Sequence, residues 1–239
     1  MRWPRALAAS FSYFSILPTR SFEGVPDADA IGWLPVVGLV IGALSGGAAY
    51  GIWILTHSTI AMAIAAWLVS IALTGAIHVD GFLDCCDGLF AMATPERRLE
   101  IMRDPHHGTY AIVGMGILSA LWIYALCQIP PGYVVIVLAM CGLLGRFFAS
   151  AIARPWHYRR PLDIGVALVV LAFALLYEVK MLHLIPGVVL LLAAALAVGA
   201  TSGFARIRLG RFSGDVYGAV VVVSEVVLLL GIPYALASQ

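Results

Sequence analysis

IGWLPVVGLVIGALSGGAAYGIWIL, residues 31–55, decides the fold, because 25 successive residues contain no Asp, Glu, Lys or Arg. A predominantly apolar run of about 20 residues is long enough to cross a bilayer as a helix. The whole chain shares this character: of its 239 residues, 62% are hydrophobic and only 11% are charged, and the mean hydropathy is +0.98. A soluble domain carries about 25% charged residues, so the composition indicates an integral membrane protein. The net charge of +1 argues against binding of nucleic acid.

The hydropathy pattern predicts an all-α integral membrane protein, a polytopic bundle of about seven transmembrane helices formed by residues 1–239 as a single domain. The expected spans are Ile31–Leu55, Ile60–Ile77, Tyr110–Ile129, Tyr133–Ala153, Ile164–Tyr177, Leu184–Gly203 and Val216–Ala235. Before them, Ala6–Leu17 is apolar but too short to span, and no small-residue cleavage pattern follows it. We expect it to form a short interfacial or re-entrant helix.

Basic residues alternate sharply between the predicted loops. Twelve arginines lie at the N-terminus and in alternate loops, whereas the opposite set of loops contains only Lys180. By the positive-inside rule, the arginine-rich loops and the N-terminus are cytoplasmic. One further arginine, Arg146, falls inside a predicted span, where isolated charges need partners, and we expect it to pair with Glu225.

An acidic cluster interrupts this apolar chain in HVDGFLDCCDG, residues 78–88. On a helix, Asp80, Asp84 and Asp87 are at positions i, i+4 and i+7 and project from one face. At about 5–6 Å and an effective dielectric near 20, two such charges repel by about 3 kcal/mol. Carboxylate oxygens select hard cations, so the three aspartates are predicted to hold Mg²⁺. Gly81 and Gly88 are expected to leave room for a ligand. The alternative is that the aspartates only mark the water-exposed end of a helix.

Further polar residues are predicted on the same cytoplasmic side. TPERRLEIMRD, residues 94–104, is typical of a helix with Thr94 as its N-cap, and Asp215 lies at the start of the last span. Substrate phosphates commonly complete the coordination of Mg²⁺ in proteins, and arginines bind phosphate oxygens bidentately. The arginines placed for this are Arg97, Arg98, Arg103 and Arg154. The residues therefore indicate a membrane enzyme that acts on a phosphate ester or pyrophosphate with Mg²⁺, and no P-loop motif is present.

Five segments in this order resemble the cobalamin synthase family, the adenosylcobinamide-GDP ribazoletransferases. They are FSYFSILPTRSF (11–22), WLPVVGLVIGALSG (33–46), LTGAIHVDGFLDCCDGLFA (73–91), RRLEIMRDPHHGTYA (97–111) and GRFSGDVYGAVVVVSE (210–225). The resemblance implies a Mg²⁺-dependent transferase in the bacterial or archaeal cytoplasmic (inner) membrane. Such an enzyme joins adenosylcobinamide-GDP and α-ribazole, or its 5′-phosphate, to give adenosylcobalamin, or its 5′-phosphate, and GMP.

The chemistry of that reaction suggests a role for each polar residue. Asp80, Asp84 and Asp87 would hold Mg²⁺ on the pyrophosphate, and Arg97 and Arg103 would neutralise its oxygens. Asp104 or His78 would accept the proton of the attacking hydroxyl. Substrate binding is further assigned to three residues, His107, Arg154 and Asp215, the last of which matches the family's Gly-Asp motif.

Several alternatives stay open at this level. His78 lies on the opposite side of an ideal helix from Asp80, so it is equally a packing residue, and His107 is equally a solvated loop residue. A CDP-alcohol phosphotransferase and a membrane transporter with intramembrane carboxylates are the alternative functions. The expected partners are the two small-molecule substrates and membrane lipid. The sequence leaves open whether the protein forms a homo-oligomer or associates with other enzymes that act on corrinoids.

Overall fold

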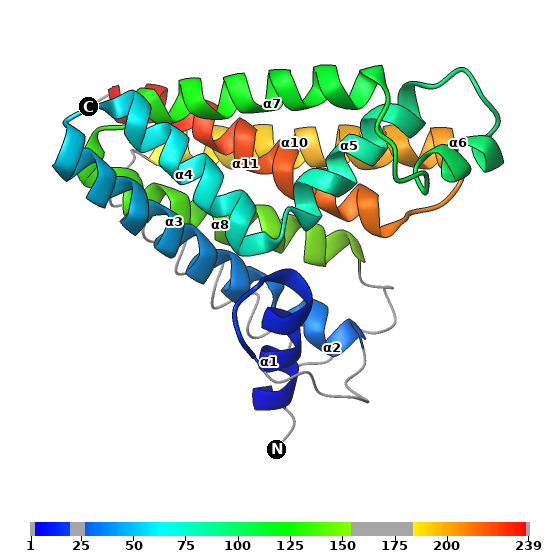
Figure 1. The fold of residues 1–239 in the computed structure, drawn as a ribbon, viewed down its shortest axis with the longest axis horizontal. Coiled ribbons are helices and arrows are strands. Elements are labelled where there is room, and N and C mark those ends of the chain that lie inside the picture. The colour runs from blue at the N-terminus through cyan, green and yellow to red at the C-terminus, as the bar shows by residue number, and fades with distance from the viewer. Residues whose placement is uncertain (1–2, 20–26, 154–183, 238–239) are drawn as a thin grey trace.

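The computed structural model describes residues 3–19, 27–153 and 184–237, and every regular element in these ranges is a helix (Figure 1). In chain order the helices are α1 (Trp3–Phe14), α2 (Asp27–Gly32), α3 (Leu34–Thr56), α4 (Thr59–Thr74), α5 (Ile77–Phe90), α6 (Pro95–Ile101), α7 (Thr109–Cys127), the 3₁₀ turn η1 (Pro131–Tyr133), α8 (Val134–Ala153), α10 (Leu184–Leu209) and α11 (Gly214–Ala237). The all-α prediction is thereby confirmed.

Among the described residues, five helices are long and apolar enough to cross a membrane. They are α3, α7, α8 with η1, α10 and α11. The number of candidate spans rises to six if the bent pair α4–α5 counts as one span. Five predicted spans correspond to the five straight helices, whereas the span expected at Ile164–Tyr177 lies outside the described residues. The number of seven therefore stays a prediction. So does the interfacial or re-entrant position expected for the N-terminal segment, although that segment does form α1.

The predicted second span, Ile60–Ile77, covers most of α4 and ends at the first residue of α5. The chain bends sharply at Gly75 and Ala76, where the axes of α4 and α5 differ by 92°. Both residues have positive φ, +59° for Gly75 and +62° for Ala76, and a glycine in the left-handed region is a common helix C-cap. The backbone N–H of Ile16, just after α1, donates to the carbonyl of Leu73 at 2.9 Å. The chain after α1 is thus joined to the break, and the aspartates lie on a separate helix.

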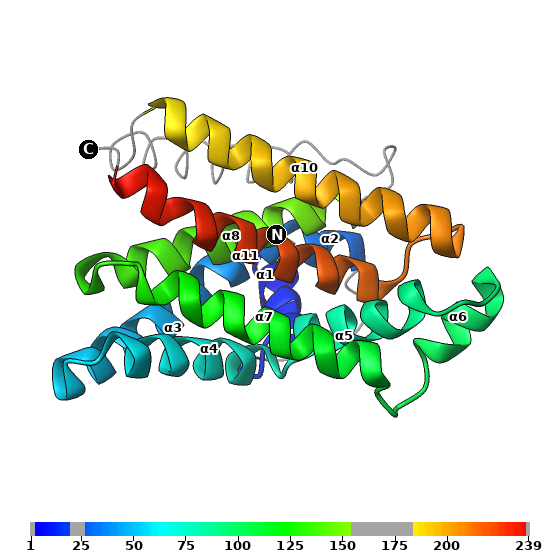
Figure 2. The ribbon, with the colours of Figure 1, turned by 90° about the horizontal axis from the view of Figure 1, so that it is seen from above.

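Glycines bring α3 and α8 into backbone contact. A Cβ atom at Gly38 would overlap the carbonyl oxygen of Gly142, and one at Gly42 would overlap that of Leu138. Helices in a bilayer gain little from hydrophobic burial, so close backbone packing at small residues is a main source of their association. The two helices therefore form the most extensive helix pair of the described bundle, while α10 lies beside α11 (Figure 2).

A second glycine contact joins α5 to α11. A Cβ atom at Gly81 would lie 2.8 Å from Cα of Asp215, and one at Gly218 would lie 3.1 Å from the carbonyl oxygen of His78. The space beside Gly81 is filled by α11, and that beside Gly88 by the side chain of Met102. The expectation that Gly81 and Gly88 leave room for a ligand was therefore wrong; Gly81 instead brings Asp215 to α5.

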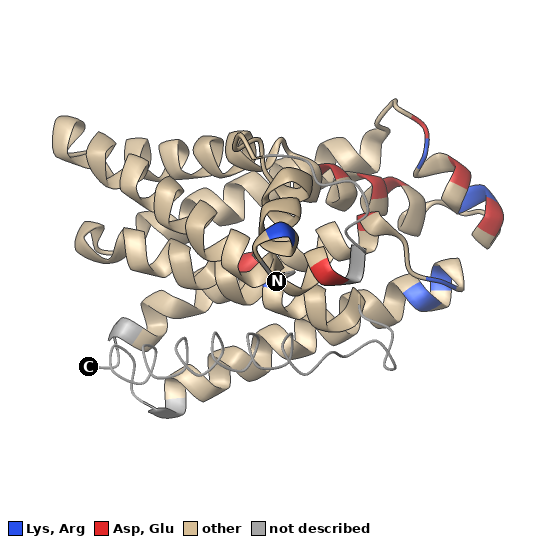
Figure 3. Cartoon of the chain, turned by 90° about the horizontal axis from the view of Figure 1, so that it is seen from below, with Lys and Arg blue, Asp and Glu red and all other residues tan. Residues whose placement is uncertain are grey.

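Most charged residues of the described chain gather at one end of the bundle, and a few lie near its middle (Figure 3). The turns at the other end within the described ranges, Thr56–Thr59 and Pro130–Gly132, carry no Asp, Glu, Lys or Arg. Inside the bundle, Nη1 of Arg146 on α8 donates to Oε1 of Glu225 on α11 at 2.6 Å, and both side chains are largely buried. This confirms the predicted intramembrane pair.

Candidate active site

The three aspartates of α5 have different surroundings, although one helix carries them all. The side chain of Asp80 is 63% exposed and that of Asp84 is 15% exposed, whereas Asp87 is buried. Nε2 of His107 lies 3.7 Å from Oδ1 of Asp80, and its Nδ1 lies 3.9 Å from Oδ1 of Asp84. Asp215, held against α5 at Gly81, is close enough to Asp84 to repel its charge. Asp80, Asp84, Asp215 and His107 therefore share one region.

Asp87 is turned toward α7 instead. Its Oδ2 accepts a hydrogen bond of 2.6 Å from the backbone N–H of Gly108, and its Oδ1 accepts one of 3.0 Å from Ala111. A carboxylate is favourable there because the first N–H groups of a helix have no partner within the helix. Within the described part of the chain, no group of three or more His, Cys, Asp or Glu side chains lies close enough together to hold a metal ion.

Asp104, one of the two candidate bases, lies in the loop between α6 and α7. Its Oδ1 accepts a 2.9 Å hydrogen bond from the backbone N–H of His106 and lies 2.8 Å from Nδ1 of the same residue. These hydrogen bonds hold the pKa of Asp104 below its usual value, the backbone N–H contributing most. Asp104 is therefore a weaker base than an ordinary aspartate. It lines a polar cavity of about 310 Å³ together with Asp87 and Arg97.

The arginines of this region serve different purposes. Arg97 is exposed and forms a 2.7 Å ion pair with Glu100, whereas Arg103 is exposed and close enough to Asp215 to attract it. Arg98 is buried and donates to the carbonyls of Gly88 and Leu89 at the end of α5 and to that of Ala93 in the loop that follows. Arg98 is thus committed to the C-terminus of α5 rather than free to bind phosphate, and Arg154 lies outside the described residues.

Arg208 of α10 is a structural residue that sequence reasoning did not single out. Its Nε donates to the carbonyl of Leu89 at 2.9 Å and its Nη2 to that of Ala91 at 3.2 Å. Cations are favourable at a helix C-terminus, where carbonyls lack partners. Arg98 and Arg208 together fix the C-terminal end of α5. The role of Arg208 was not predictable, because it lies 119 residues from Leu89 in the sequence.

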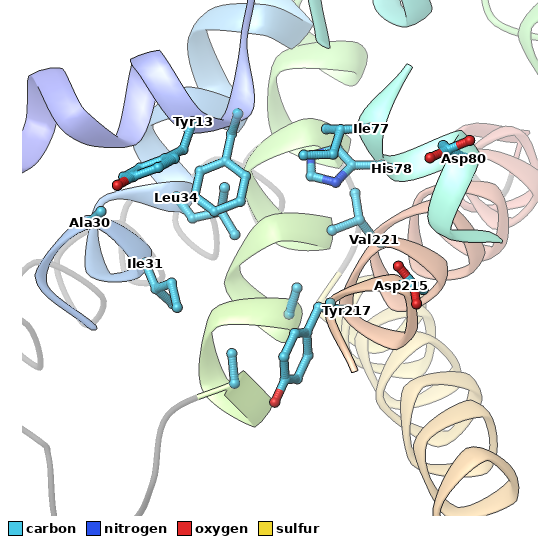
Figure 4. Close-up of a pocket in the computed structure, with 15 residues that line it drawn as sticks. Tyr13, Ala30, Ile31, Leu34, Ile77, His78, Asp80, Asp215, Tyr217 and Val221 are labelled. Carbon is cyan, nitrogen blue, oxygen red and sulfur yellow. The ribbon is translucent and has the colours of Figure 1, made fainter. Parts of the chain in front are cut away.

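A larger cavity of about 470 Å³ adjoins the aspartates (Figure 4). It is bounded by α1, α2, α3, α5, α8 and α11, and its polar lining residues are Tyr13, His78, Asp80, Asp215 and Tyr217. The ring of Phe14 stacks on that of His78, with centroids 6.2 Å apart and planes at 17°. His78 is 7% exposed, and its Nε2 has no hydrogen-bond partner among the described residues.

The structure thus divides the predicted site into two groups. His78, Asp80 and Asp215 line the larger cavity, whereas Asp87, Arg97 and Asp104 line the smaller one. The aromatic side chains of the larger cavity were missed as site residues: Tyr13 and Phe14 on α1, and Tyr217 on α11. Aromatic residues near span ends are usual in membrane proteins, so these three residues did not stand out as site residues in the sequence.

A polytopic helical membrane protein with a carboxylate-rich site at its charged end is the class that this fold and site define. Within that class, the chain belongs to the cobalamin-5-phosphate synthase family, whose model matches residues 6–233. This confirms the family resemblance noted above and favours it over a CDP-alcohol phosphotransferase or a transporter.

Curated relatives cover nearly the whole chain. A protein of Brucella anthropi is 32% identical over 92% of this chain and 92% of its own. A protein of Trichormus variabilis is 30% identical over 93% of this chain and 94% of its own. A protein of Deinococcus radiodurans is 30% identical over 94% of this chain and 84% of its own. All three are named adenosylcobinamide-GDP ribazoletransferase. No solved structure matches this chain.

Proposed function

We propose that this protein joins adenosylcobinamide-GDP to α-ribazole, or to its 5′-phosphate, and so completes the nucleotide loop of adenosylcobalamin or its 5′-phosphate. The observation that carries the proposal is the match to relatives of this name along nearly the whole chain. In the reaction, a ribose hydroxyl oxygen forms a bond to the phosphorus next to cobinamide. The bond from that phosphorus to the GMP oxygen breaks, GMP leaves with the electron pair, and the hydroxyl proton passes to a base.

Magnesium dependence belongs to this proposal. Asp80 and Asp84 would hold Mg²⁺, with Asp215 beside them. The donors fit this ion, because Mg²⁺ at phosphoryl-transfer sites binds one or two carboxylates and takes its other ligands from water and substrate phosphates. When bound, it would neutralise charge that develops on the transferring phosphoryl group. Since Asp87 already accepts two backbone hydrogen bonds, we assign it to positioning α7 rather than to the metal.

The remaining roles follow from position. Arg103, attracted to Asp215, would bind pyrophosphate oxygens next to the carboxylates, and His107 would contact the same oxygens from the other side of Asp80 and Asp84. Arg97, beside the smaller cavity, would contact a more distant phosphate. Of the two candidate bases, we favour His78, since it shares a cavity with Asp80 and Asp215, whereas Asp104 is engaged by His106.

We further propose that the charged end faces the cytoplasm in the cytoplasmic membrane and that the N-terminus lies on this side. The support is the one-sided distribution of arginines together with the gathering of charged residues at one end of the bundle. Reporter fusions at either terminus test it: a cytoplasmic reporter should be active at the N-terminus, and an active cytoplasmic reporter at a C-terminus expected outside would contradict the orientation.

The reaction is tested with purified protein in liposomes that receive adenosylcobinamide-GDP and α-ribazole, with and without Mg²⁺. Chromatography follows GMP and the new corrinoid. We expect equal amounts of both products, formed only with the metal. An absence of products from protein that shows a cooperative thermal transition would contradict the proposed function. Transport of a corrinoid without GMP release would instead favour a transporter.

A further inference from the structure

The larger cavity has the size of a small-molecule site. Its volume of about 470 Å³ lies within the range of about 300–1,000 Å³ that is usual for such sites. A corrin ring that carries adenosyl and GDP groups is far too large to enter it whole. The cavity therefore has room for either the second substrate or a nucleoside-sized part of the first.

The residues that line the cavity favour one of these two occupants, the acceptor substrate or the guanosine part of the donor, over the other. Most of the wall is apolar and includes Ile31, Leu34 and Val221. A guanine ring presents several hydrogen-bond donors and acceptors, and polar groups that are buried without partners cost free energy. The benzimidazole base of α-ribazole has two methyl groups and only one free acceptor nitrogen, so an apolar wall suits it better.

The polar side chains of the cavity lie where a ribose would need them. Asp80 on α5 and Asp215 on α11 line the cavity at the side away from Tyr13 and Ala30 (Figure 4). Phe14 and His78, whose rings stack on each other, also line the cavity and provide aromatic surface of the kind on which a planar base packs. An aromatic base and a ribose thus have separate, matching surroundings in one cavity.

We propose that this cavity binds the acceptor nucleoside, with its aromatic base among α1, α3 and α8 and its ribose toward Asp80 and Asp215. The inference rests on the proposed function and adds the location of the second substrate. It also gives α1 and α2 a role, because they close the side of the cavity opposite the aspartates. The donor substrate then reaches the aspartates from outside this cavity.

Two alanines of α8 provide a matched test. Ala153 lines the cavity and is half-buried, whereas Ala151 is exposed and does not line it. Ala153→Leu should weaken binding of α-ribazole, measured at equilibrium in lipid nanodiscs without donor. It should raise the KM for α-ribazole by about tenfold or more. The KM for adenosylcobinamide-GDP and kcat should stay near the wild-type values, and Ala151→Leu should behave as wild type.

Tyr13→Ala is the second variant, because it removes a largely exposed ring from the cavity edge without filling space. It too should raise the KM for α-ribazole. An increase confined to the KM for adenosylcobinamide-GDP would overturn the inference in favour of a guanosine site. Unchanged constants in both variants would overturn it in favour of a space filled by lipid. In both cases wild-type turnover would leave the proposed function intact, whereas wild-type protein that binds α-ribazole but never forms GMP would contradict the function alone.

Discussion

Asp87 on α5 accepts a 2.6 Å hydrogen bond from the backbone N–H of Gly108, which directly precedes α7. A second bond, from Ala111, engages the other carboxylate oxygen. We expect Asp87→Ala to lower the free energy of unfolding by about 2 kcal/mol, because the buried N–H of Ala111 and the partly buried N–H of Gly108 lose a charged acceptor. Thermal unfolding in detergent measures this, with Glu96→Ala, at an exposed residue of α6, as the control. If Asp87→Asn unfolds like wild type yet loses metal-dependent turnover, Asp87 is a ligand after all.

Asp84 is the central carboxylate of the site, with Asp80, Asp87 and Asp215 all close enough to repel its charge. Asp84→Asn should reduce GMP formation by about a hundredfold or more, since charge stabilisation in the transition state is lost. Its thermal stability should be unchanged or higher, because the mutation relieves repulsion between carboxylates. Turnover and melting are measured on the same preparation. Near-normal turnover of Asp84→Asn would contradict its role at the metal.

The identity of the base is tested by comparing His78 with Asp104. His78→Gln should lower kcat by about 10²–10⁴, the usual contribution of a general base. Asp104→Asn should lower kcat much less, since the Asp104 carboxylate is already hydrogen-bonded to His106. The pH profile of kcat distinguishes a general base from a packing residue. If His78→Gln loses the fall in kcat at low pH, His78 acts as the general base. An unchanged profile with lower stability would identify His78 as a packing partner of Phe14.

The buried pair of Arg146 and Glu225 predicts a rescue by charge exchange. Either single reversal, Arg146→Glu or Glu225→Arg, places two like charges inside the bundle and should destabilise it by at least about 3 kcal/mol. The double exchange should recover much of this loss, as judged by thermal unfolding and by the yield of monodisperse protein. A double variant no more stable than the single ones would show that the surroundings, such as the carbonyl of Gly142 near Arg146, fix which helix carries the arginine.

The glycine contact between α5 and α11 should matter more for activity than for stability. Gly81→Ala places a methyl group 2.8 Å from Cα of Asp215, so the two helices must separate and the carboxylates move apart. We expect turnover to fall by about tenfold or more, because small displacements of catalytic groups are costly. Gly116→Ala on α7, where nothing lies within 4 Å of the added atom, is the control. Equal activity of both variants would contradict a role for the contact.

Local signals account for what the sequence predicted correctly. The spanning helices follow from hydropathy summed over about 20 neighbouring residues. Helix α6 follows from its N-cap, where the side chain of Thr94 accepts from the N–H of Arg97 at 3.4 Å. The Arg146–Glu225 pair was also predictable, although 79 residues separate them, because a charge within a bilayer requires a partner.

Features that depend on tertiary packing were not predictable. Hydropathy does not report the direction of a helix axis, so the pattern predicted an end of the second span near Ile77 but not the 92° bend there. The three aspartates share a helix face, but only the position of α7 draws Asp87 away from the other two. Likewise, the aromatic cavity is built from six helices, and no single segment contains its pattern.

The glycine contact between α3 and α8 also constrains how the protein is made. Helix α3 leaves the ribosome directly after α1 and α2, yet α8, the helix that covers its glycines, is synthesised only after α4 to α7. Until then α3 must stand in the bilayer with its most closely packed face against lipid, which its apolar composition permits. The close backbone contact between α3 and α8 therefore forms late in biogenesis. Truncated nascent chains that end before α8 should remain inserted but unassembled, and thus open to membrane proteases.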